Sequence, residues 1–334
     1  MAVYTEVSMD EAHVLFEQLQ LGQLQSLVGC AGGIENTNYF ASTDKGEFVL
    51  TLFERLTEEQ LPYYLRLMKH LAVHGIPAPN PATNADGDVV HTLNGKPAAV
   101  VNRLSGKSEL QPQPAHCAQL GAMLAKMHMA AASFSMRQDN LRGITWWNAT
   151  APVIMPFLST DESDLLQSEL AYQNHIASSA AYVALPRGPI HADLFRDNAL
   201  FDAATEPSEA SQLSGFFDFY FAGNDALLFD LAVCLNDWCV DLDSGALQLP
   251  QSQALIQAYT KVRPLHPAER QLLPAMARAG ALRFWISRLW DKHLPREARM
   301  LQAHDPGRFE RVLRQRISNP MHLALLHTNP VHAP

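Results

Sequence analysis

The sequence is short of basic residues, and this limits the partners that it can bind. Its 334 residues contain 25 Lys and Arg against 34 Asp and Glu, a formal net charge of −9 at pH 7. Nucleic acids and anionic membranes are bound by surfaces rich in Lys and Arg, so we expect neither as a partner. Small molecules are the expected ligands, and a polyanion among them must be held by local groups such as backbone N–H donors or a metal ion.

Cysteine pairs, long apolar runs and repeats are also missing. The four cysteines, Cys30, Cys117, Cys234 and Cys239, form no CxxC pair and no zinc-site spacing, which predicts free thiols in a reducing compartment. No run approaches the ~20 apolar residues that a membrane helix needs, and the first residues lack the pattern of a signal peptide. We therefore expect a cytoplasmic protein.

The length and the residue pattern predict two regions. At roughly 150 residues per domain, the length indicates two domains or two lobes that share a cleft. We place the boundary after Leu104, where the polar, Pro-containing stretch "SGKSELQPQP" begins. The regions expected are therefore 1–104 and 105–334.

Apolar periodicity and turn residues predict a small mixed region before this boundary. The expected elements are a helix over 8–21, a loop over 28–38, strands over 39–44 and 46–55, a helix capped by Thr57 that ends at Gly75, and a hairpin over 88–93 and 96–104 that turns at Asn94 and Gly95. After residue 115 the pattern is mostly helical, apart from short strands around 191–201 and 215–221. The fold class is therefore α+β, with an antiparallel sheet first and a larger, mainly helical part second.

The stretch "HADLFRDN" at 191–198 concentrates polar side chains between a strand-like "PI" and the apolar run "ALF". Its Asp193 and Asn198 lie five apart on one loop, and Asp218 follows among phenylalanines, where a carboxylate is costly without compensation. Phosphoryl transfer requires an acid that accepts a hydroxyl proton. It also requires groups that hold a divalent cation, here a carboxamide and a second acid. We expect Asp193 to be the base, and Asn198 and Asp218 to be ligands of Mg²⁺.

This pattern resembles the catalytic and metal motifs of the aminoglycoside phosphotransferase and choline kinase superfamily. The resemblance implies a bilobal protein-kinase-like fold, in which residues 1–104 bind the nucleotide and residues 105–334 carry catalysis and bind the acceptor. It extends to "LFDLAVCLNDW", where Asp230 looks like a structural acid, and to "LGAMLAKMH" with His128. We interpret His191 as a support of the catalytic loop and His128 as a packed core residue.

Within the superfamily the chain looks most like the homoserine kinases of the bacterial threonine pathway. The stretches that carry this likeness are "GGIENTNYF" at 32–40, "FVLTLFER" at 48–55 and "RFWISRLWD" at 283–291. The resemblance implies transfer of the γ-phosphate of ATP to the side-chain hydroxyl of L-homoserine, with Mg²⁺ as cofactor.

The expected nucleotide site departs from kinase-like folds at one position. Thr51 stands where such folds usually place a phosphate-binding Lys or Arg, and Arg55 is a possible substitute if its strand extends that far. The glycine-containing loop can cover phosphates with backbone N–H groups, and the purine is expected near 102–104. The candidate nucleotide-binding residues are Gly32, Gly33, Asn36, Thr37, Asn38, Thr51, Arg55, Asn102 and Leu104.

A substrate amino acid needs a cation for its carboxylate and an acid for its ammonium group. Arg288 lies on an aromatic-rich helix where an unpaired guanidinium is expensive, so we expect it to bind the carboxylate. Asp225 or Asp237 is expected near the ammonium group, and Asp193 near the hydroxyl.

Two other functions compete with this one. One is a kinase of another small hydroxylated acceptor, such as an aminoglycoside, choline, ethanolamine or methylthioribose. The other is a catalytically dead, kinase-like binding module, which Thr51 suggests. The presence of Asp193, Asn198 and Asp218 together speaks against a dead module.

Overall fold

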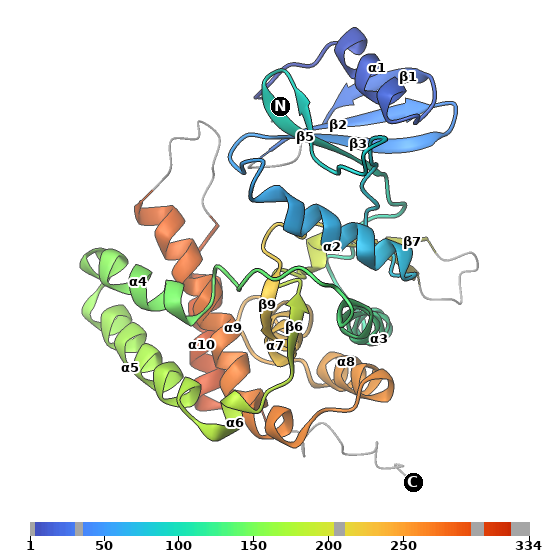
Figure 1. The fold of residues 1–334 in the computed structure, drawn as a ribbon. Helices are drawn as coiled ribbons and strands as arrows, with labels where there is room; N and C mark the ends of the chain where they lie inside the picture. The colour runs from blue at the N-terminus through green and yellow to red at the C-terminus, as the bar shows by residue number, and fades with distance from the viewer. Residues whose placement is uncertain (1–3, 31–35, 204–210, 295–303, 322–334) are drawn as a thin grey trace. The chain divides into compact units, whose positions relative to one another are not determined.

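The structure, a computed structural model, describes residues 4–30, 36–203, 211–294 and 304–321 (Figure 1). The described residues form two compact units. The first comprises the chain up to Ser105 together with Ser214–Phe217, and the second comprises Gly106–Leu213 and the chain from Asp218 onward. The assignment of nucleotide binding to the first region and of catalysis to the second stays a prediction.

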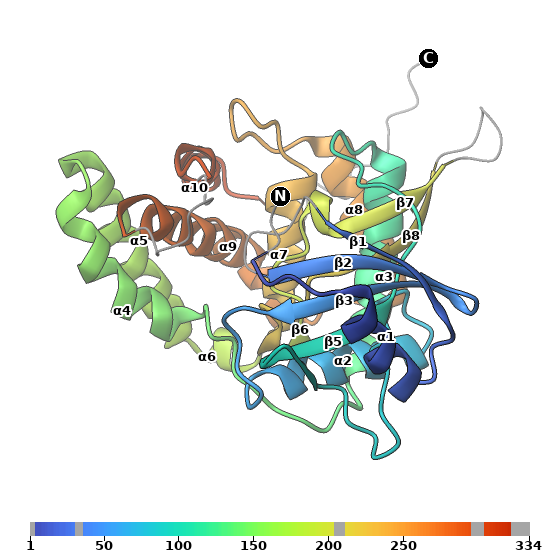
Figure 2. The ribbon, with the colours of Figure 1, turned by 90° about the horizontal axis from the view of Figure 1, so that it is seen from above.

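The first unit is built on a five-stranded antiparallel sheet with the order β1-β2-β3-β5-β4. Helix α1 begins with a capping box in which the side chains of Ser8 and Glu11 satisfy each other's backbone N–H groups. It lies over one face of the sheet (Figure 2), and its Leu15 and Phe16 belong to the apolar cluster that the helix forms with the sheet. The elements of this unit are α1 (Met9–Gln18), β1 (Leu24–Gly29), β2 (Asn36–Thr43), β3 (Gly46–Phe53), α2 (Leu61–Val73), β4 (His91–Leu93) and β5 (Lys96–Asn102).

Both predicted hairpins of the first unit are confirmed. The turn between β4 and β5 uses Asn94 and Gly95 at φ values of +51° and +72°, which is the left-handed pair that a tight hairpin turn needs. Strand β1 was not predicted. The expected loop is shorter than 28–38, because β1 runs to Gly29 and β2 begins at Asn36.

The predicted start of the second helix was wrong. Helix α2 begins at Leu61 and its N-cap is Gln60, whereas Thr57 lies before the helix. The backbone N–H of Thr57 donates to the side-chain oxygen of Gln60 over 3.1 Å. These two residues therefore close a turn ahead of the helix, and Pro62 occupies the first helical turn, where a missing N–H costs nothing.

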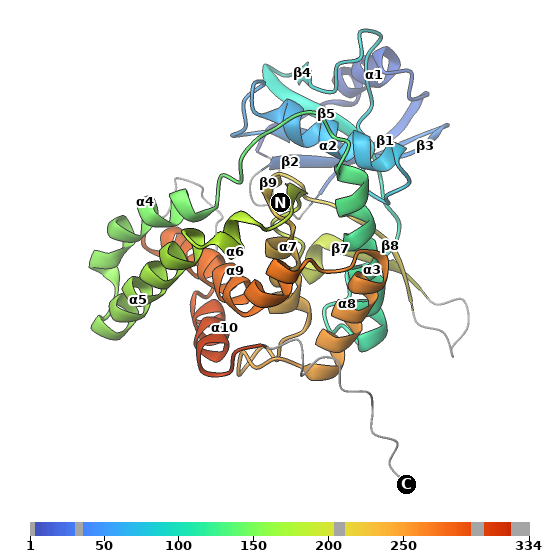
Figure 3. The same cartoon turned by 60° about the horizontal axis from the view of Figure 1, so that its bottom comes forward.

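The second unit is mainly helical. Helix α3 packs against α8, and α9 packs against α7, α10, α4 and α5 (Figure 3). The elements are α3 (Pro114–Ala131), α4 (Ile144–Ile154), η1 (Met155–Phe157), α5 (Thr160–Ala177), α6 (Ala180–Val183), β6 (Arg187–Ile190), η2 (Arg196–Asn198), β7 (Ala199–Asp202), β8 (Gln212–Phe216), β9 (Gly223–Ala226), α7 (Leu227–Trp238), α8 (Leu249–Val262), α9 (Pro267–His293) and α10 (Gly307–Ser318). Strand β8 starts in this unit and continues into the first. The α+β fold class is therefore confirmed.

A short antiparallel ladder between β6 and β9 positions the two polar loops of the second unit. In its register Ile190 lies opposite Gly223. Gly223 begins β9. A Cβ atom there would lie 2.8 Å from Cα of Asn140, so glycine permits the 139–140 segment to pack on the strand. The loop that starts at His191 and the loop that ends at Ala222 consequently meet at one end of the ladder.

In the described ranges, no helix is both long and apolar enough to cross a membrane.

The contact between α3 and α8 generates a stability prediction. A Cβ atom on Gly121 would lie 2.2 Å from the backbone oxygen of Leu255, and backbone cannot move aside as a side chain can. Gly121→Ala should therefore lower the free energy of unfolding by about 1–3 kcal/mol, the usual cost of overpacking, as measured by urea denaturation. Gly188→Ala is the control, because its new methyl group would meet only Leu227 Cδ2 at 3.5 Å. Equal effects of the two substitutions would contradict this account.

Candidate active site

The loop at 191–198 is held by a buried carboxylate on α7. Asp230 is 0% exposed, and its two oxygens accept the backbone N–H groups of His191 and Ala192, each over 2.7 Å. Ala192 has a φ of +63°, a left-handed conformation that costs a residue with a Cβ roughly 1–2 kcal/mol. The two hydrogen bonds from Asp230 therefore hold the loop in a shape that its own backbone disfavours.

Asp230 stays ionised because of its neighbours. Burial alone would raise its pKa, but the hydrogen bond and charge of His128, and to a lesser extent His191, hold the pKa below its usual range. His128 Nε2 lies 3.1 Å from Asp230 Oδ2, and its Nδ1 lies 2.8 Å from the hydroxyl of Tyr259. His191 is fully buried and its ring packs against Phe219 with the centroids 4.5 Å apart.

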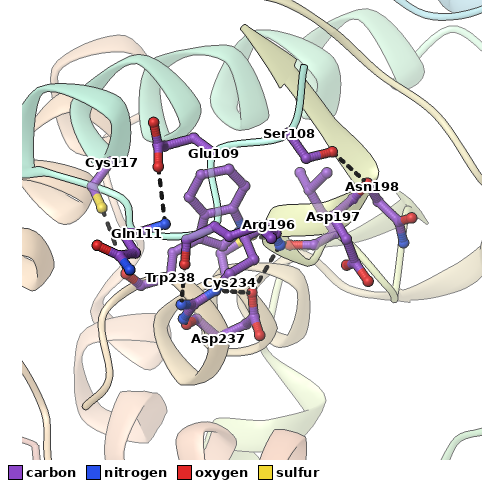
Figure 4. Close-up of polar contacts among 12 residues, drawn as sticks. Ser108, Glu109, Gln111, Cys117, Arg196, Asp197, Asn198, Cys234, Asp237 and Trp238 are labelled. Atoms are coloured by element: carbon purple, nitrogen blue, oxygen red, sulfur yellow. Dashed lines mark hydrogen bonds and ion pairs between the residues drawn. The ribbon is translucent and has the colours of Figure 1, made fainter. Parts of the chain in front are cut away.

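A second acid of α7 anchors the other half of the loop (Figure 4). Asp237 accepts both the backbone N–H and the Nε–H of Arg196, over 2.8 and 3.2 Å. The carbonyl oxygen of Leu194 accepts a 2.9 Å hydrogen bond from the indole of Trp238. Helix α7 thus fixes the loop at both ends.

The side chain of Asp193 contrasts with these anchored acids. Within the described ranges its carboxylate has no hydrogen bond or ion pair. Burial raises its pKa well above the usual range, and the negative charges of Asp218, Asp197 and Asp237 raise it further, while the positive charge of Arg283 opposes the rise. The result is a carboxyl group with an unusually high affinity for a proton, half-buried at the end of the β6–β9 ladder.

Asn198 and Asp218 present oxygen atoms that suit a hard divalent cation. The Asn198 side-chain NH₂ donates to the backbone oxygen of Asp193 over 2.8 Å, so its Oδ1 is left for another ligand. Asp218 is half-buried in the loop before β9, with a φ of +67°. The described residues contain no group of three or more His, Cys, Asp or Glu able to hold a metal by themselves. Such a cation must therefore take the rest of its ligands from a substrate or water, as Mg²⁺ commonly does.

Sequence reasoning missed Arg283. This residue of α9 is 3% exposed, and within the described part of the chain its Nε and Nη2 atoms have no hydrogen-bond partner. Its charge acts on Asp193, and burial lowers its pKa to about 10. The surrounding stretch "ARAGALRFW", rich in small and apolar residues, is a signal of burial that could have identified it.

The candidate substrate residues are already engaged. Asp225 accepts hydrogen bonds from Arg187 Nη1 and Asn140 Nδ2, both over 2.9 Å. Asp237 is paired with Arg196 and Arg308. These contacts do not support binding of the substrate ammonium group by Asp225 or Asp237. Arg288 donates to the backbone oxygen of Asp305 over 3.1 Å and stacks on Phe309.

In the first unit, Thr51 and Asn38 lie together on the sheet face opposite α1. Their side chains form a 2.7 Å hydrogen bond from the hydroxyl to Oδ1. Strand β3 ends at Phe53, so the condition under which Arg55 would replace the missing basic residue is not met, and Arg55 is exposed.

The other nucleotide candidates of this unit have local roles. The Thr37 hydroxyl donates to Glu54 Oε1 over 2.7 Å and accepts two backbone N–H groups. Asn102 Oδ1 accepts the N–H of Asn80 over 2.7 Å. Asn36 and Leu104 are half-buried, whereas Gly32 and Gly33 lie outside the described residues.

The sequence is closely similar to known kinases. A profile described as the phosphotransferase enzyme family matches residues 26–265. A homoserine kinase of Polaromonas naphthalenivorans (strain CJ2) is 60% identical over 320 residues, which cover 96% of this chain and 99% of that protein. A homoserine kinase of Janthinobacterium sp. (strain Marseille) is 52% identical over 317 residues, which cover 95% of this chain and 96% of that one.

Solved structures share the fold. Amicoumacin kinase hAmiN, in complex with AMP-PNP, Ca²⁺ and Ami, matches with a TM-score of 0.67 at 17% identity, over 94% of this chain and 95% of that one. Choline kinase LicA from Streptococcus pneumoniae matches with a TM-score of 0.62 at 12% identity, over 93% and 100%. At these identities the likeness shows the fold alone.

The free energy of unfolding should respond differently when Asp230 or Asp193 is replaced by Asn. Asp230→Asn removes a buried charge that two N–H groups and His128 require, so the free energy of unfolding should fall by about 3–5 kcal/mol. Asp193→Asn should leave it unchanged or raise it. Because the pKa of Asp193 is higher in the folded protein, ionisation of this group disfavours folding at neutral pH.

Thermal and urea unfolding of the two variants at pH 7 measure this difference. Destabilisation by Asp193→Asn comparable to that by Asp230→Asn would show that Asp193 is a structural acid, and would contradict the account.

Proposed function

The chain belongs to the phosphotransferase enzyme family, and we propose that it transfers the γ-phosphoryl group of ATP to the side-chain hydroxyl of L-homoserine, giving O-phospho-L-homoserine. The resemblance to homoserine kinases seen in the sequence is confirmed by relatives that match nearly the full length of the chain. The choice of homoserine over other acceptors follows these relatives, and the site's geometry supports the chemistry.

One observation carries the mechanism: the β6–β9 ladder brings an unpaired acid and two oxygen ligands to one place. Asp193 and Asn198 follow β6, and Asp218 precedes β9, on loops joined by the pair Ile190 and Gly223. The charge of Asp218 raises the pKa of Asp193, so the two carboxyl groups lie within electrostatic reach of each other. This proximity supports the proposal that the proton is accepted next to the bound cation.

In the proposed reaction Asp193 orients the acceptor hydroxyl and takes its proton. The hydroxyl oxygen bonds to the γ-phosphorus of ATP, the bond from that phosphorus to the β–γ bridging oxygen breaks, and ADP leaves. A base is most effective when its pKa lies near the working pH, and burial moves the pKa of Asp193 in that direction.

Asn198, through Oδ1, and Asp218 would hold Mg²⁺ together with phosphate oxygens of ATP. A bound divalent cation neutralises negative charge on the phosphates during transfer. In the first unit, Asn102 and Leu104 are proposed to lie near the purine, and the face that carries Asn38 and Thr51 to lie toward the phosphates.

The direct test is a coupled ADP-release assay with MgATP and several acceptors: L-homoserine, choline, kanamycin, methylthioribose and L-serine. We expect turnover with L-homoserine, and a loss of about 10³-fold or more with Asp193→Asn, because no base remains beside the hydroxyl. Asp218→Asn should also abolish turnover, and should remove the Mg²⁺ dependence of nucleotide binding in thermal-shift assays.

Turnover with another acceptor alone would overturn the choice of substrate. No turnover with any acceptor, together with no Mg²⁺-dependent nucleotide binding, would overturn the proposed reaction and favour a binding module.

The acidic limb of the pH profile gives a second prediction. Exposed Asp197 raises the pKa of Asp193, and only ionised Asp193 accepts the proton. Asp197→Asn should therefore move the acidic limb of kcat/KM for L-homoserine to lower pH, by roughly 0.2–0.7 of a unit, since an exposed charge acts weakly. Asp243→Asn, at another exposed acid of the second unit, is the control for the change in net charge. An unmoved limb, or the same shift in both variants, would contradict this assignment.

A further inference from the structure

Arg283 is a buried cation whose hydrogen-bonding capacity is mostly unused. Its Nη1 reaches Ser287 Oγ only at 3.4 Å, and its Nε and Nη2 have no partner within the described ranges. A guanidinium group has five N–H donors, and leaving them unmet in the interior costs free energy. Arg196, another buried arginine of the second unit, is paired with Asp237, whereas Arg283 has no acid partner among the described residues. The N–H groups of Arg283 are therefore available to an anionic ligand.

Aromatic rings hold this guanidinium group in place. Its central carbon lies 3.9 Å from the ring centroid of Phe284 and 4.9 Å from that of Phe221. Arginine stacked on aromatic faces keeps its in-plane N–H donors directed outward from the rings. A planar anion, which accepts two parallel hydrogen bonds, is the ligand that such a fork fits best.

A second arginine shares the same aromatic frame. Arg142 lies with its central carbon 5.9 Å from the ring centroid of Phe221 and 4.4 Å from that of Trp146. Its backbone N–H donates to Asn140 Oδ1 over 2.9 Å, and Asn140 is tied to β9 through its backbone N–H, which donates to Asn224. Two positive charges are thus held near each other around Phe221, which makes the electrostatic potential there favourable to an anion.

The position of Arg283 beside the loop before β9 indicates which anion it binds. Phe221, over which the guanidinium group lies, comes three residues after Asp218 and shortly before β9 begins at Gly223. The charge of Asp193 also acts on Arg283, so the guanidinium group lies within electrostatic reach of the acid that is proposed to accept the hydroxyl proton. The acceptor molecule has its own anionic group there, since homoserine carries its carboxylate on the same small skeleton as its hydroxyl.

We propose that Arg283, with Arg142 as a supporting charge, receives the α-carboxylate of the acceptor amino acid and selects for acceptors that carry it. This inference rests on the proposed function, because it assumes that the acceptor is L-homoserine. It replaces Arg288 as the carboxylate receptor. Arg288 donates a hydrogen bond to the backbone oxygen of Asp305, and its guanidinium group lies over the ring of Phe309 in α10.

The test compares two acceptors that differ only in this group: L-homoserine, and L-homoserinol, in which the carboxylate is a hydroxymethyl group. The wild-type protein should prefer L-homoserine in kcat/KM for phosphorylation of the common side-chain hydroxyl, with product position assigned by ³¹P NMR. Arg283→Gln should lower kcat/KM for L-homoserine by about 10- to 100-fold, the loss expected for a hydrogen-bonded charge. It should change kcat/KM for L-homoserinol less than threefold, so the preference collapses.

Two further variants sharpen the result. Arg283→Lys keeps the charge and is expected to fold even if Arg283→Gln does not. It should show an intermediate preference, because an ammonium group lacks the two-pronged fork. Arg288→Gln should keep the wild-type ratio between the two acceptors, whatever its effect on the absolute rate.

The outcomes separate cleanly. An equal loss with both acceptors would mean that Arg283 acts on Asp193 or on the phosphoryl group, and would overturn the inference. A collapse of the ratio in Arg288→Gln but not in the Arg283 variants would return the role to Arg288. If the wild-type protein does not phosphorylate L-homoserine at all, the proposed function itself fails, and this inference fails with it.

Discussion

The site depends on one buried carboxylate, Asp230. Its two oxygens accept the N–H groups of His191 and Ala192, and His128 compensates its charge from the other side. Without these bonds nothing would compensate for the unfavourable positive φ of Ala192. The chain beyond Ala192 would then leave the β6–β9 ladder in another direction. Because Asp193 is the next residue, the direction of the proposed base is set by Asp230, an acid that is fully buried.

Several buried acids of the second unit are paired with arginines. Glu169 is bonded to Arg278, and Glu269 to Arg263. In contrast, Asp193 and Arg283 act on each other electrostatically, yet no ion pair joins them in the part of the chain that the structure describes. Unsatisfied groups of this kind cost stability, and they are expected where a ligand completes the arrangement. The same unpaired state gives Asp193 its raised pKa.

The chemistry of the site could be predicted from the sequence better than its architecture. A loop with Asp193 and Asn198 after a short apolar run, followed by Asp218 among aromatic residues, is a local pattern and needs no knowledge of distant contacts. Strand β9 was missed because its residues, Gly223–Ala226, have little strand propensity and pair only through tertiary context. Glycine is required there by the approach of Asn140, which no local pattern reveals.

The sequence alone also could not decide whether Arg283 or Arg288 binds the carboxylate, because the decision depends on tertiary contacts. Both lie in "RFWISRLWD", and the hydrogen bond of Arg288 to the backbone oxygen of Asp305, just before α10, forms only in the folded structure.

The most direct measurement is a crystal structure with Mg²⁺, a non-hydrolysable ATP analogue and L-homoserine. The account predicts the homoserine hydroxyl within hydrogen-bond distance of Asp193, the cation on Asn198 and Asp218, and the carboxylate on Arg283. A hydroxyl directed away from Asp193, with the cation bound elsewhere, would contradict it.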